Sequence, residues 1–522
     1  MNTGSSRLIA FLLVLVLLGG MVYVALTQDG PVLSSKLKVV DDEVIDTSRE
    51  QAKKDAPLIL WYTDESLTDY LNSMALAYQE ETQIKVTPVL MSGVEYLEQI
   101  NRASVDNKDF PDLYITSNDN LLKAYYAGLA EPIQDKDQVV IPKNYPQTAL
   151  HAVACDDSYV AYPFYYETNF FLYNKTFMAD LAKKSIETEA DLAEGMEATA
   201  NIEAAESEEA AADVVMGEDD ANAEVSQNQL AEGTDEEQYE LSQEVLTQMS
   251  TMIPSTINDI LAFADNYDAP ETVENVFKWD VSDIFYNYFF VGNYIDVGGE
   301  DGDNNASFHV YNQETIDCLQ VYQDLNQFFS IDSKAVTYDT ILEEFIQGKT
   351  VFTVATTDAI AKIEEAKSKG EFDYEYGVAV LPNISDKLVA RGLSVTNGVV
   401  INGYSNRPDQ ANAFAKYLTY ENLDTLYKRS EKIACRYGLE YDNPEINNTM
   451  LEYQKSVSMP KMIEASNFWM QLEITFTKIW NGSDPESELV ALAELIGSQI
   501  DEIGYDIPEQ ESISAGADSD VK

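Results

Sequence analysis

The side chains able to do chemistry in this 522-residue chain are mostly carboxylates: 91 Asp and Glu against 33 Lys and Arg, a formal net charge of −58. Only two histidines (His151 and His309) and three cysteines (Cys155, Cys318 and Cys435) accompany them. This leaves little room for His-based catalysis, and the cysteines match no zinc spacing. So acidic a surface repels nucleic-acid phosphates. The composition predicts a binding protein rather than an enzyme, with no metal, cofactor or nucleic-acid partner.

Two motif-like stretches do not meet the requirements of the sites that they resemble. The run 348–350 (GKT) is similar to the end of a phosphate-binding loop, but Glu343 stands where that loop needs its first glycine. Asp301, Asp303 and Asn305 have the oxygen spacing of a calcium loop, but its sixth position is not Gly and its twelfth is not Glu. A polar turn is expected there, and calcium binding stays an open question.

The start of the chain predicts a compartment. Arg7 precedes an uncharged run, 8–27, of about 20 residues, which is long enough to cross a bilayer as a helix. A cleaved signal peptide needs small residues at its exit, whereas 23–25 reads Tyr-Val-Ala. We expect residues 1–28 to be an N-terminal transmembrane anchor, with a cleaved signal and secretion as the alternative. Arg7 then places the acidic bulk outside the cell, and 29–55 forms a polar tether.

The segment 185–250 differs from the rest in composition. No Lys or Arg occurs between Lys184 and Lys278, and 187–240 holds 19 acidic residues with neither Phe nor Trp. Such a stretch cannot bury enough apolar surface to offset chain entropy. We expect an acidic disordered insertion on a surface loop, although its Ala and Glu content tolerates transient helix. A calcium-buffering or partner-binding tract is the alternative to a merely solvated one.

The remaining sequence alternates strands and helices. Apolar runs predict strands at 58–62, 84–89 and 112–115, separated by helices at 65–82 and 94–103. This β-α-β-α-β order indicates a mostly parallel α/β sheet. The same order returns later, with strands at 352–354, 376–381 and 399–401, a helix at 408–419, and two helices between 466 and 500.

Six blocks in order carry a family resemblance: 78–89 (YQEETQIKVTPV), 111–133 (PDLYITSNDNLLKAYYAGLAEPI), 162–175 (YPFYYETNFFLYNK), 344–352 (EFIQGKTVF), 376–382 (YGVAVLP) and 458–469 (SMPKMIEASNFW). On these blocks the chain from about 57 to 500 resembles the extracellular solute-binding proteins of ABC importers. The resemblance is to the maltose-binding-protein-like sugar-binding group (family 1). It implies a bilobal periplasmic-binding-protein-like fold, in which two α/β lobes close over a ligand by hinge motion.

The resemblance also implies a division of the chain. The bilobal domain covers 56–505, with a tail at 506–522. Its expected parts are lobe 1 at about 56–165 and 392–437, lobe 2 at about 170–390 and 440–505, and chain crossings near Tyr166, Arg391 and Tyr437.

Sugar sites combine aromatic faces for ring C–H groups with carboxylates and amides for hydroxyls. By resemblance, Asp119 and Glu167 bind sugar hydroxyls and Trp469 stacks on a sugar ring. The structural alternatives are a helix cap for Asp119, an ion pair for Glu167 and core packing for Trp469. The further ligand-binding candidates are Tyr165, Tyr166, Trp61, Trp279, Asp283 and Asp358.

The departures from the family pattern affect the expected ligand. Thr116 and Asp358 stand where maltose binders carry further stacking tryptophans, and Glu473 stands where they carry a basic residue. A long maltodextrin is therefore not expected to bind in the same way. We expect a mono- or oligosaccharide of open identity, while the acidic lining would also suit an amine or another cationic solute.

Together these features predict a membrane-tethered extracellular monomer that captures a carbohydrate and delivers it to an ABC transporter permease. The same fold could instead be the ligand-sensing component of a signalling complex. A surface structural or adhesive protein is a third class. Counting carboxylates does not exclude glycoside hydrolysis, but no G-x-S-x-G nucleophile element is present.

Overall fold

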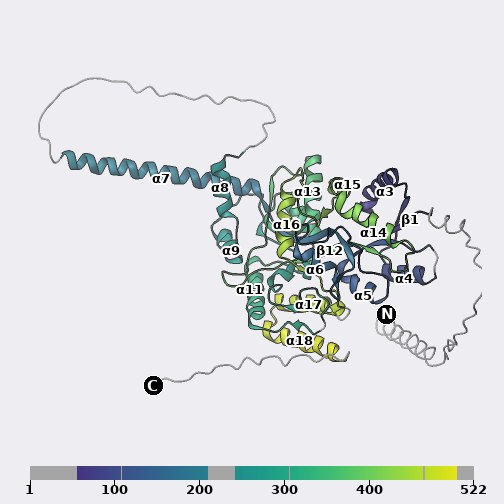
Figure 1. The fold of residues 1–522 in the computed structure, drawn as a ribbon. Coiled ribbons are helices and arrows are strands. Elements are labelled where there is room, and N and C mark those ends of the chain that lie inside the picture. The colour runs from purple at the N-terminus through teal and green to yellow at the C-terminus, as the bar shows by residue number, and fades with distance from the viewer. Residues whose placement is uncertain (1–55, 107–108, 210–240, 305, 463–464, 503–522) are drawn as a thin grey trace, which may run out of the picture. The chain divides into compact units, whose positions relative to one another are not determined.

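The computed structural model describes residues 56–106, 109–209, 241–304, 306–462 and 465–502 (Figure 1). The expected anchor, tether and tail all lie outside these ranges, as do residues 210–240 of the acidic segment. Within the described ranges, no helix combines the length and the apolar character needed to cross a membrane.

Most of the strands belong to one ten-stranded sheet. Its order is β2-β1-β3-β12-β6-β10-β7, with β11 and β13 also paired to β6 and β14 paired to β12. The strands are β1 (Leu58–Tyr62), β2 (Val86–Leu90), β3 (Leu113–Ser117), β4 (Ala154–Cys155), β5 (Ser158–Tyr159), β6 (Ala161–Asn174), β7 (Asn275–Phe277), β8 (Asp296–Val297), β9 (Phe308–His309), β10 (Thr350–Thr356), β11 (Tyr376–Ala379), β12 (Leu393–Ile401), β13 (Ile433–Ala434) and β14 (Val457–Ser458).

Helices connect and cover these strands. The α-helices are α3 (Thr68–Thr82), α4 (Tyr96–Asp106), α5 (Leu121–Tyr126), α6 (Gln147–Val153), α7 (Lys175–Glu209), α8 (Gln243–Met252), α9 (Ile257–Asn266), α10 (Ile284–Asn287), α11 (Gln313–Phe329), α12 (Tyr338–Ile346), α13 (Asp358–Lys369), α14 (Pro408–Lys416), α15 (Leu426–Ser430), α16 (Glu445–Lys455), α17 (Ala465–Trp480) and α18 (Pro485–Glu502). Short 3₁₀ turns are η1 (Glu65–Leu67), η2 (Asn118–Asn120) and η3 (Tyr288–Phe290), and η4 (Tyr417–Glu421) is a π-helix.

Strand β6 joins two lobes. Its first half pairs with β12 as far as Thr168, opposite Ser394, and from Asn169 onward it pairs with β10 and β11. We call the part built on β1, β2 and β3 the first lobe, and the part built on β7, β10 and β11 the second lobe. Every residue of β6 is buried except Glu167, which lies where the strand passes from one lobe to the other. The mixed α/β, bilobal architecture expected from the sequence is confirmed.

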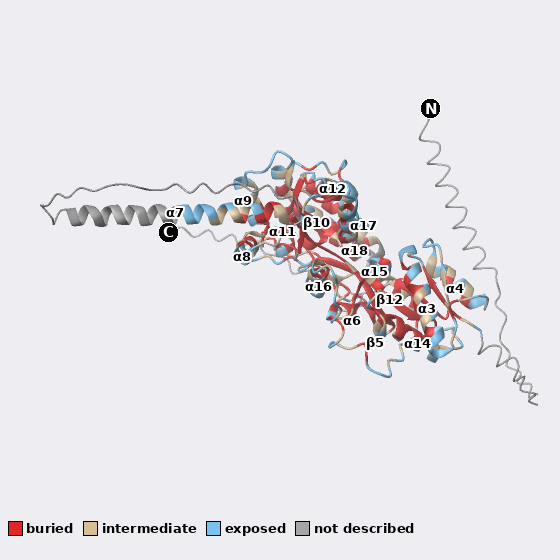
Figure 2. Ribbon diagram, turned by 90° about the horizontal axis from the view of Figure 1, so that it is seen from above, coloured by how far each residue is buried: buried red, intermediate tan, exposed pale blue. Residues whose placement is uncertain are grey.

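The local elements agree with the sequence pattern. In the first lobe β1 runs parallel to both β2 and β3, and the intervening helices are α3 and α4. The strands predicted later in the chain are β10, β11 and β12, and the two C-terminal helices are α17 and α18. Figure 2 shows β10 and β12 in the buried colour, whereas helices such as α3 and α4 carry exposed outer faces. Apolar periodicity predicts these helices and strands because each element must bury one apolar face in the core.

The acidic segment is more ordered at its ends than the sequence suggests. The expectation of disorder from 185 onward is corrected, because α7 continues as one helix to Glu209 and α8 begins at Gln243 and contacts it (Figure 1). Alanine and glutamate have high helix propensity, so the segment can extend a helix without burying an apolar face. Residues 210–240 lie outside the described part of the chain.

The buried side chains form three clusters. One lies in the second lobe around Trp279, Phe290 and Trp480. Another lies in the first lobe around Tyr114 and Leu121. The third continues along β6 from the first lobe into the second. The connection between the lobes is therefore a buried strand with packed neighbours rather than an exposed linker.

Candidate functional site

A cavity of about 500 Å³ lies where the two lobes meet. Its lining comes from both sides of the crossing strands. Glu167 of β6, Val395 of β12 and Lys432 contribute from the strands that cross, and the second lobe contributes Asp283, Phe285, Tyr286, Tyr338, Thr356, Thr357, Asp358 and Lys362. We call this space the front cavity.

On the first-lobe side, Lys432 is the centre of a charge network. Its Nζ lies 2.8 Å from Asp64 Oδ2 and 3.3 Å from Glu167 Oε1, and it lies over the ring of Tyr165 at 5.3 Å. The backbone brings these groups together because β13, directly after Lys432, pairs with Tyr165 and Tyr166 of β6. Burial opposes a charged lysine, but the carboxylates of Glu167 and Asp64 outweigh it and raise the pKa of Lys432. The ammonium is thus held charged at the cavity wall.

On the second-lobe side, a hydroxyl and carboxylate network surrounds Asp358 at the carboxyl end of β10. The Tyr338 hydroxyl donates to Asp358 Oδ1 at 2.8 Å, Thr356 Oγ1 also donates to it, and Lys362 Nζ lies 2.8 Å from Asp358 Oδ2. Burial alone would raise the pKa of Asp358, but these donors stabilise the carboxylate and lower the pKa overall. Tyr338 stacks on Tyr286, with ring centroids 4.9 Å apart. The second lobe therefore offers an aromatic pair beside a fixed carboxylate.

Asp283 differs from the other two cavity carboxylates. It caps α10, where Oδ1 accepts the Phe285 N–H at 2.8 Å, and no ion pair involves it within the described residues. Burial, together with the nearby Asp280, raises the pKa of Asp283. Burial and the charge of Asp283 likewise raise the pKa of Glu473 on α17. This corner of the front cavity carries negative charge without a matching cation.

Three residues singled out from the sequence, Glu167, Asp283 and Asp358, line the front cavity together. They come from β6, the start of α10 and the start of α13, which are far apart along the chain. The fold thus gathers these carboxylates at one place.

Asp119 and Trp469 lie near the lobe junction but do not line the front cavity. Asp119 lies in η2 directly after β3, and its Oδ1 accepts from Ser117 Oγ at 2.5 Å. Trp469 on α17 is half-buried and meets the rings of Tyr288 and Phe468 edge to face, each at 5.3 Å. Both side chains keep part of their surface exposed.

The remaining aromatic candidates are core residues. Trp279 is fully buried and donates from Nε1 to Asn287 Oδ1 at 2.9 Å, and Trp61 packs in the first-lobe core. Tyr166 stacks on Tyr453 with ring centroids 3.9 Å apart. Tyr165 is buried behind Lys432. None of these four side chains lines the front cavity.

Sequence reasoning missed Tyr286, Tyr338, Lys362 and Lys432. With 32 tyrosines in the chain, no pattern distinguishes the two that stack here. Lys362 could have been predicted from its place on α13, which follows β10 directly. Ligands bind at the carboxyl ends of strands in α/β sheets, so the start of this helix is an expected binding position. Lys432 gains its place only through the pairing of β13 with β6.

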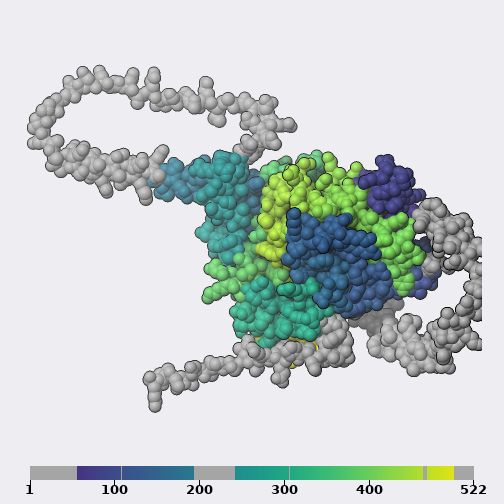
Figure 3. All heavy atoms as spheres, in the orientation of Figure 1, coloured from purple at the N-terminus to yellow at the C-terminus, as the bar shows by residue number. Residues whose placement is uncertain are grey.

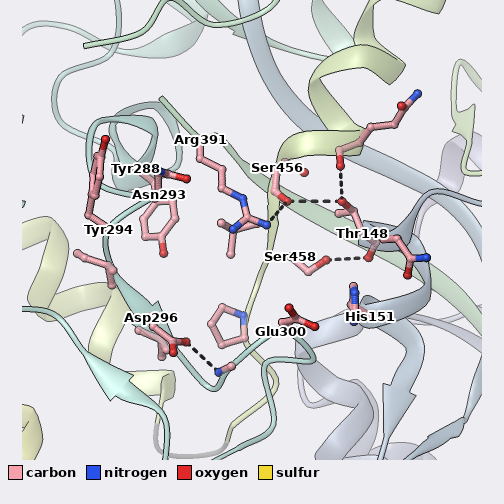
Figure 4. A pocket seen from close by; sticks show the side chains of 18 residues that line it. Thr148, His151, Tyr288, Asn293, Tyr294, Asp296, Glu300, Arg391, Ser456 and Ser458 are labelled. Atoms are coloured by element: carbon pink, nitrogen blue, oxygen red, sulfur yellow. Dashed lines mark hydrogen bonds between the residues drawn. The ribbon is translucent and has the colours of Figure 1, made fainter. Parts of the chain in front are cut away.

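A second cavity, of about 430 Å³, also has walls from both lobes. Figure 4 shows Thr148 and His151 of α6 on one side, Tyr288 and Asp296 of the second lobe on the other, and Arg391, Ser456, Ser458 and Glu300 between them, with Glu300 next to His151. On one face of the molecule, the blue surface of the chain up to about residue 150 adjoins the teal and green surface around residue 300 (Figure 3), consistent with the contact between His151 and Asp301. We call this space the reverse cavity.

Strand register places the two cavities on opposite faces of the crossing strands. Val395 is paired with Glu167, and both line the front cavity. The preceding residue, Ser394, points to the other face, where its hydroxyl accepts from Ser456 Oγ at 2.7 Å, and Ser456 lines the reverse cavity. Paired residues share a face of a sheet and successive residues alternate between faces. The front and reverse cavities are therefore separated by β6, β12 and β14.

Other chemistry finds no support among the described residues. No group of three His, Cys, Asp or Glu there is placed to hold a metal ion. In the calcium-like loop, Asp301 contacts His151 and Asp303 accepts the Asp156 N–H, while position 305 lies outside the described residues. All three cysteines are buried, and burial raises the pKa of the Cys155 and Cys318 thiols to about 12, so these thiols remain protonated and unreactive.

Comparison with solved structures shows the same fold. The extracellular solute-binding protein from Staphylococcus aureus, in complex with maltose, matches with a TM-score of 0.64 and 20% identity, over 87% of this chain and 100% of that chain. A cyclo/maltodextrin-binding protein complexed with maltotetraose matches at 0.62 and 18%, over 85% and 98%. The maltose-binding periplasmic protein MalE from Listeria monocytogenes, in complex with maltose, matches at 0.62 and 18%, over 87% and 99%. No curated protein gives a significant match by sequence.

A family model supplies the stronger statement. The model of the bacterial extracellular solute-binding proteins matches residues 73–431, more than half of the 522-residue chain. The matched region contains most strands of the ten-stranded sheet (β2, β3, β6, β7, β10, β11 and β12) and ten of the eleven residues that line the front cavity, while Lys432 lies one residue beyond it. This chain therefore belongs to the family of bacterial extracellular solute-binding proteins.

Proposed function

We propose that this protein captures a saccharide in the front cavity and delivers it to an ABC transporter permease. One observation carries the proposal: Glu167, Asp283 and Asp358, each assigned to the ligand from the sequence, line one cavity between the lobes. A volume of about 500 Å³ suits a small ligand, because sites for such ligands span about 300–1,000 Å³.

The chemistry of the walls supports a polyhydroxylated ligand. Tyr286 and Tyr338 offer ring surface to sugar C–H groups, while Glu167 and Asp358 accept hydrogen bonds from hydroxyls. Lys432 and Lys362 are fixed by carboxylates and can donate to sugar oxygens. Asp119 and Trp469 are half-buried near the junction, and we propose that they join the site when the lobes close.

A cationic solute is the second candidate, favoured by one specific observation. Asp283 is a cavity carboxylate without an ion pair among the described residues, and Asp280 and Glu473 add negative charge beside it. An ammonium group on the ligand would offset this charge. An amino sugar would use both the aromatic pair and Asp283.

We further propose that an N-terminal helix at 8–27 tethers the protein to the membrane with its lobes outside the cell. Support comes from the uncharged run itself and from membership of an extracellular family. Membrane fractionation of the full-length chain against a form lacking residues 1–28 tests the tether. Release of both forms into the medium would refute it.

Ligand binding is tested by thermal shift and titration calorimetry of the full-length protein. The probes are glucose, maltose and maltotetraose, with glucosamine, putrescine and lysine as cationic probes. We expect a sugar to raise Tm, since a ligand that binds only the folded state stabilises it. Glu167→Gln and Asp358→Asn should remove the shift, whereas Glu80→Gln, an exposed change on α3 away from the cavity, should keep it.

The outcomes separate the candidates. A shift with a neutral sugar that is lost in the cavity variants supports the saccharide proposal. A shift confined to glucosamine or putrescine, and lost in Asp283→Asn, replaces it with the cationic one. A sugar shift that persists in both Glu167→Gln and Asp358→Asn places the ligand elsewhere and overturns the site.

A further inference from the structure

The loop 298–304 of the second lobe reaches the first lobe at the edge of the reverse cavity. Asp301 Oδ1 lies 2.6 Å from His151 Nδ1 on α6, and Asp303 Oδ2 accepts the N–H of Asp156 at 3.4 Å. Beneath them Lys461, which is fully buried, donates from Nζ to the His151 carbonyl at 2.7 Å and to the Asp301 carbonyl. These contacts join the lobes on the face opposite the front cavity.

The loop is held in shape by its own backbone and by the segment after β14. Lys461 N–H and Met462 N–H both donate to the Gly302 carbonyl, at 2.7 and 3.1 Å. A Cβ on Gly302 would lie 3.0 Å from Pro460 Cα, so the loop lies close against this segment. The hydrogen bonds and packing of this loop therefore hold Asp301 in position next to His151.

At the front cavity, by contrast, each lobe satisfies its own lysine. Lys432 pairs with Asp64 and with Glu167 of the crossing strand. Lys362 pairs with Asp358 and Asp339 of the second lobe. The charged pairs at the front therefore do not resist a change in the separation of the lobes, whereas the pair His151–Asp301 does.

The position of the crossing strands between the two cavities determines how a hinge rotation affects each cavity. Because the two cavities lie on opposite faces of β6, β12 and β14, a hinge rotation that narrows the front cavity widens the reverse face. Widening separates α6 from the loop 298–304 and breaks the His151–Asp301 contact. The lobes therefore cannot close over a solute while the His151–Asp301 contact is intact.

We propose that His151 and Asp301 form a proton-sensitive latch that holds the lobes together on the reverse face and opposes closure over solute. Protonation of the imidazole turns the hydrogen bond into a charge-assisted ion pair, which strengthens the latch. Acid conditions then strengthen the latch and favour the open front cavity. Neutral to alkaline conditions weaken the latch and allow the front cavity to close. Histidine is the side chain whose charge changes between about pH 5 and 8.

Charged and titratable groups lie around His151 on several elements. Asp301 contacts it from the loop and Glu300 lines the same cavity, while Asp303 of the loop accepts the Asp156 N–H in the turn after β4. The charged groups of opposite sign are Arg391, across the reverse cavity, and the buried Lys461, whose pKa is lowered chiefly by burial. The neighbouring Cys155 thiol and Tyr159 hydroxyl are neutral, since burial raises the pKa of both. Carboxylates thus outnumber cations around the imidazole.

The size of the effect follows from exposure. The side chains of His151 and Asp301 are 31% and 38% exposed, so solvent screens the pair. A pair of this kind shifts the ratio of latched to released molecules by about two- to fivefold. Linkage then sets a change of at most the same factor in solute affinity between the two protonation states.

The test needs no solute, so it stands apart from the proposed saccharide function. Nitroxide labels at Gln147→Cys and Asn293→Cys report the distance across the reverse cavity in the full-length protein by pulsed electron resonance. Both positions are exposed and line the cavity from opposite lobes, whereas the native cysteines are buried. We expect the ratio of short to long distances to rise about two- to fivefold as pH falls from 8 to 5.

Matched variants make the result specific. His151→Gln and Asp301→Asn should each abolish the pH dependence. His309→Gln should keep it, because His309, the other histidine of the chain, lies 4.0 Å from Asp296 within the second lobe. A distance distribution that does not change with pH in the native sequence overturns the latch. So does a pH dependence that survives in both latch variants, with circular dichroism establishing that each is folded.

Discussion

Gly392 lies against Asn169 where the chain crosses between the lobes: a Cβ at Gly392 would overlap Asn169 Oδ1. The same atom would meet Leu381 Cδ1 at 3.0 Å and Glu452 Oε1 at 3.1 Å. Asn169 is buried and donates from Nδ2 to the Phe285 carbonyl at 2.7 Å, so it cannot swing away freely. The crossing strands are thus packed too closely for any side chain at position 392.

Gly392→Ala should therefore destabilise the protein. Overpacking a buried site costs about 1–3 kcal/mol, and urea unfolding followed by circular dichroism measures the loss. Gly93→Ala is the matched control, because nothing lies within 4 Å of a Cβ there. Equal stability of the two variants would show that the close approach is absent in solution.

Alanine substitutions at Trp279 and Trp469 should differ in their effects on stability and on solute binding. Trp279→Ala removes a fully buried ring, with an expected loss of about 3–5 kcal/mol in the free energy of unfolding. Trp469 is half-buried, so Trp469→Ala should cost less stability, about 1–2 kcal/mol, while weakening solute binding. Chemical denaturation and calorimetry with the solute that raises Tm measure both. A Trp469→Ala protein with native affinity would remove this ring from the proposed site.

Asp358 should contribute stability that depends on pH. Although burial acts to raise its pKa, the donors Lys362, Thr356 and Tyr338 outweigh burial and lower it, so the folded state binds this proton less readily than the unfolded state. The contribution is complete above the ordinary pKa of about 4 and is lost as pH falls through the lowered value. Asp358→Asn should therefore unfold at lower urea than the native protein at pH 7. The difference should shrink below about pH 3.5, and a constant difference would contradict the assignment.

Glu452 should show the opposite sign. It is fully buried beside the crossing strands, accepts the Leu381 N–H at 2.9 Å, and burial raises its pKa despite Lys455 at 3.2 Å. A raised carboxyl pKa penalises the folded state above that pKa, and the penalty disappears as pH falls through it. Glu452→Gln should unfold at higher urea than the native protein at pH 8 and equal it near pH 5. Lower stability of the variant at both pH values would show that the charged form is the one the fold requires.

Much of the fold was predictable from local pattern. The strands β1, β2 and β3 and the helices between them follow from apolar periodicity, because each element must bury one face whatever its partners are. The six family blocks likewise predicted the family and its bilobal architecture. The sequence predicted an acidic insertion that tolerates transient helix, and in the structure α7 extends into it as far as Glu209, because a composition too polar to form a core is still rich in helix-forming Ala and Glu.

The cavity walls were only partly predictable. Glu167 was a candidate because it lies in a matched family block, and Asp358 because it stands where maltose binders carry a stacking tryptophan, whereas no local pattern distinguishes Lys432, Tyr286 and Tyr338. Trp279 and Tyr166, further ligand-binding candidates from the sequence, are buried and do not line the front cavity, because residue type alone does not tell which face of a sheet or helix a ring occupies.

The sequence by itself determined which segments become strands and helices, the acidic character of the protein and its family, since these depend on local propensity and composition. Only the tertiary structure decided which carboxylates share a cavity and which side chains lie on the front or the reverse of the crossing strands. The register of β12 against β6 and β14 assigns Val395 to one face and Ser394 to the other. That choice depends on long-range pairing, because a shift of one residue would exchange the two faces.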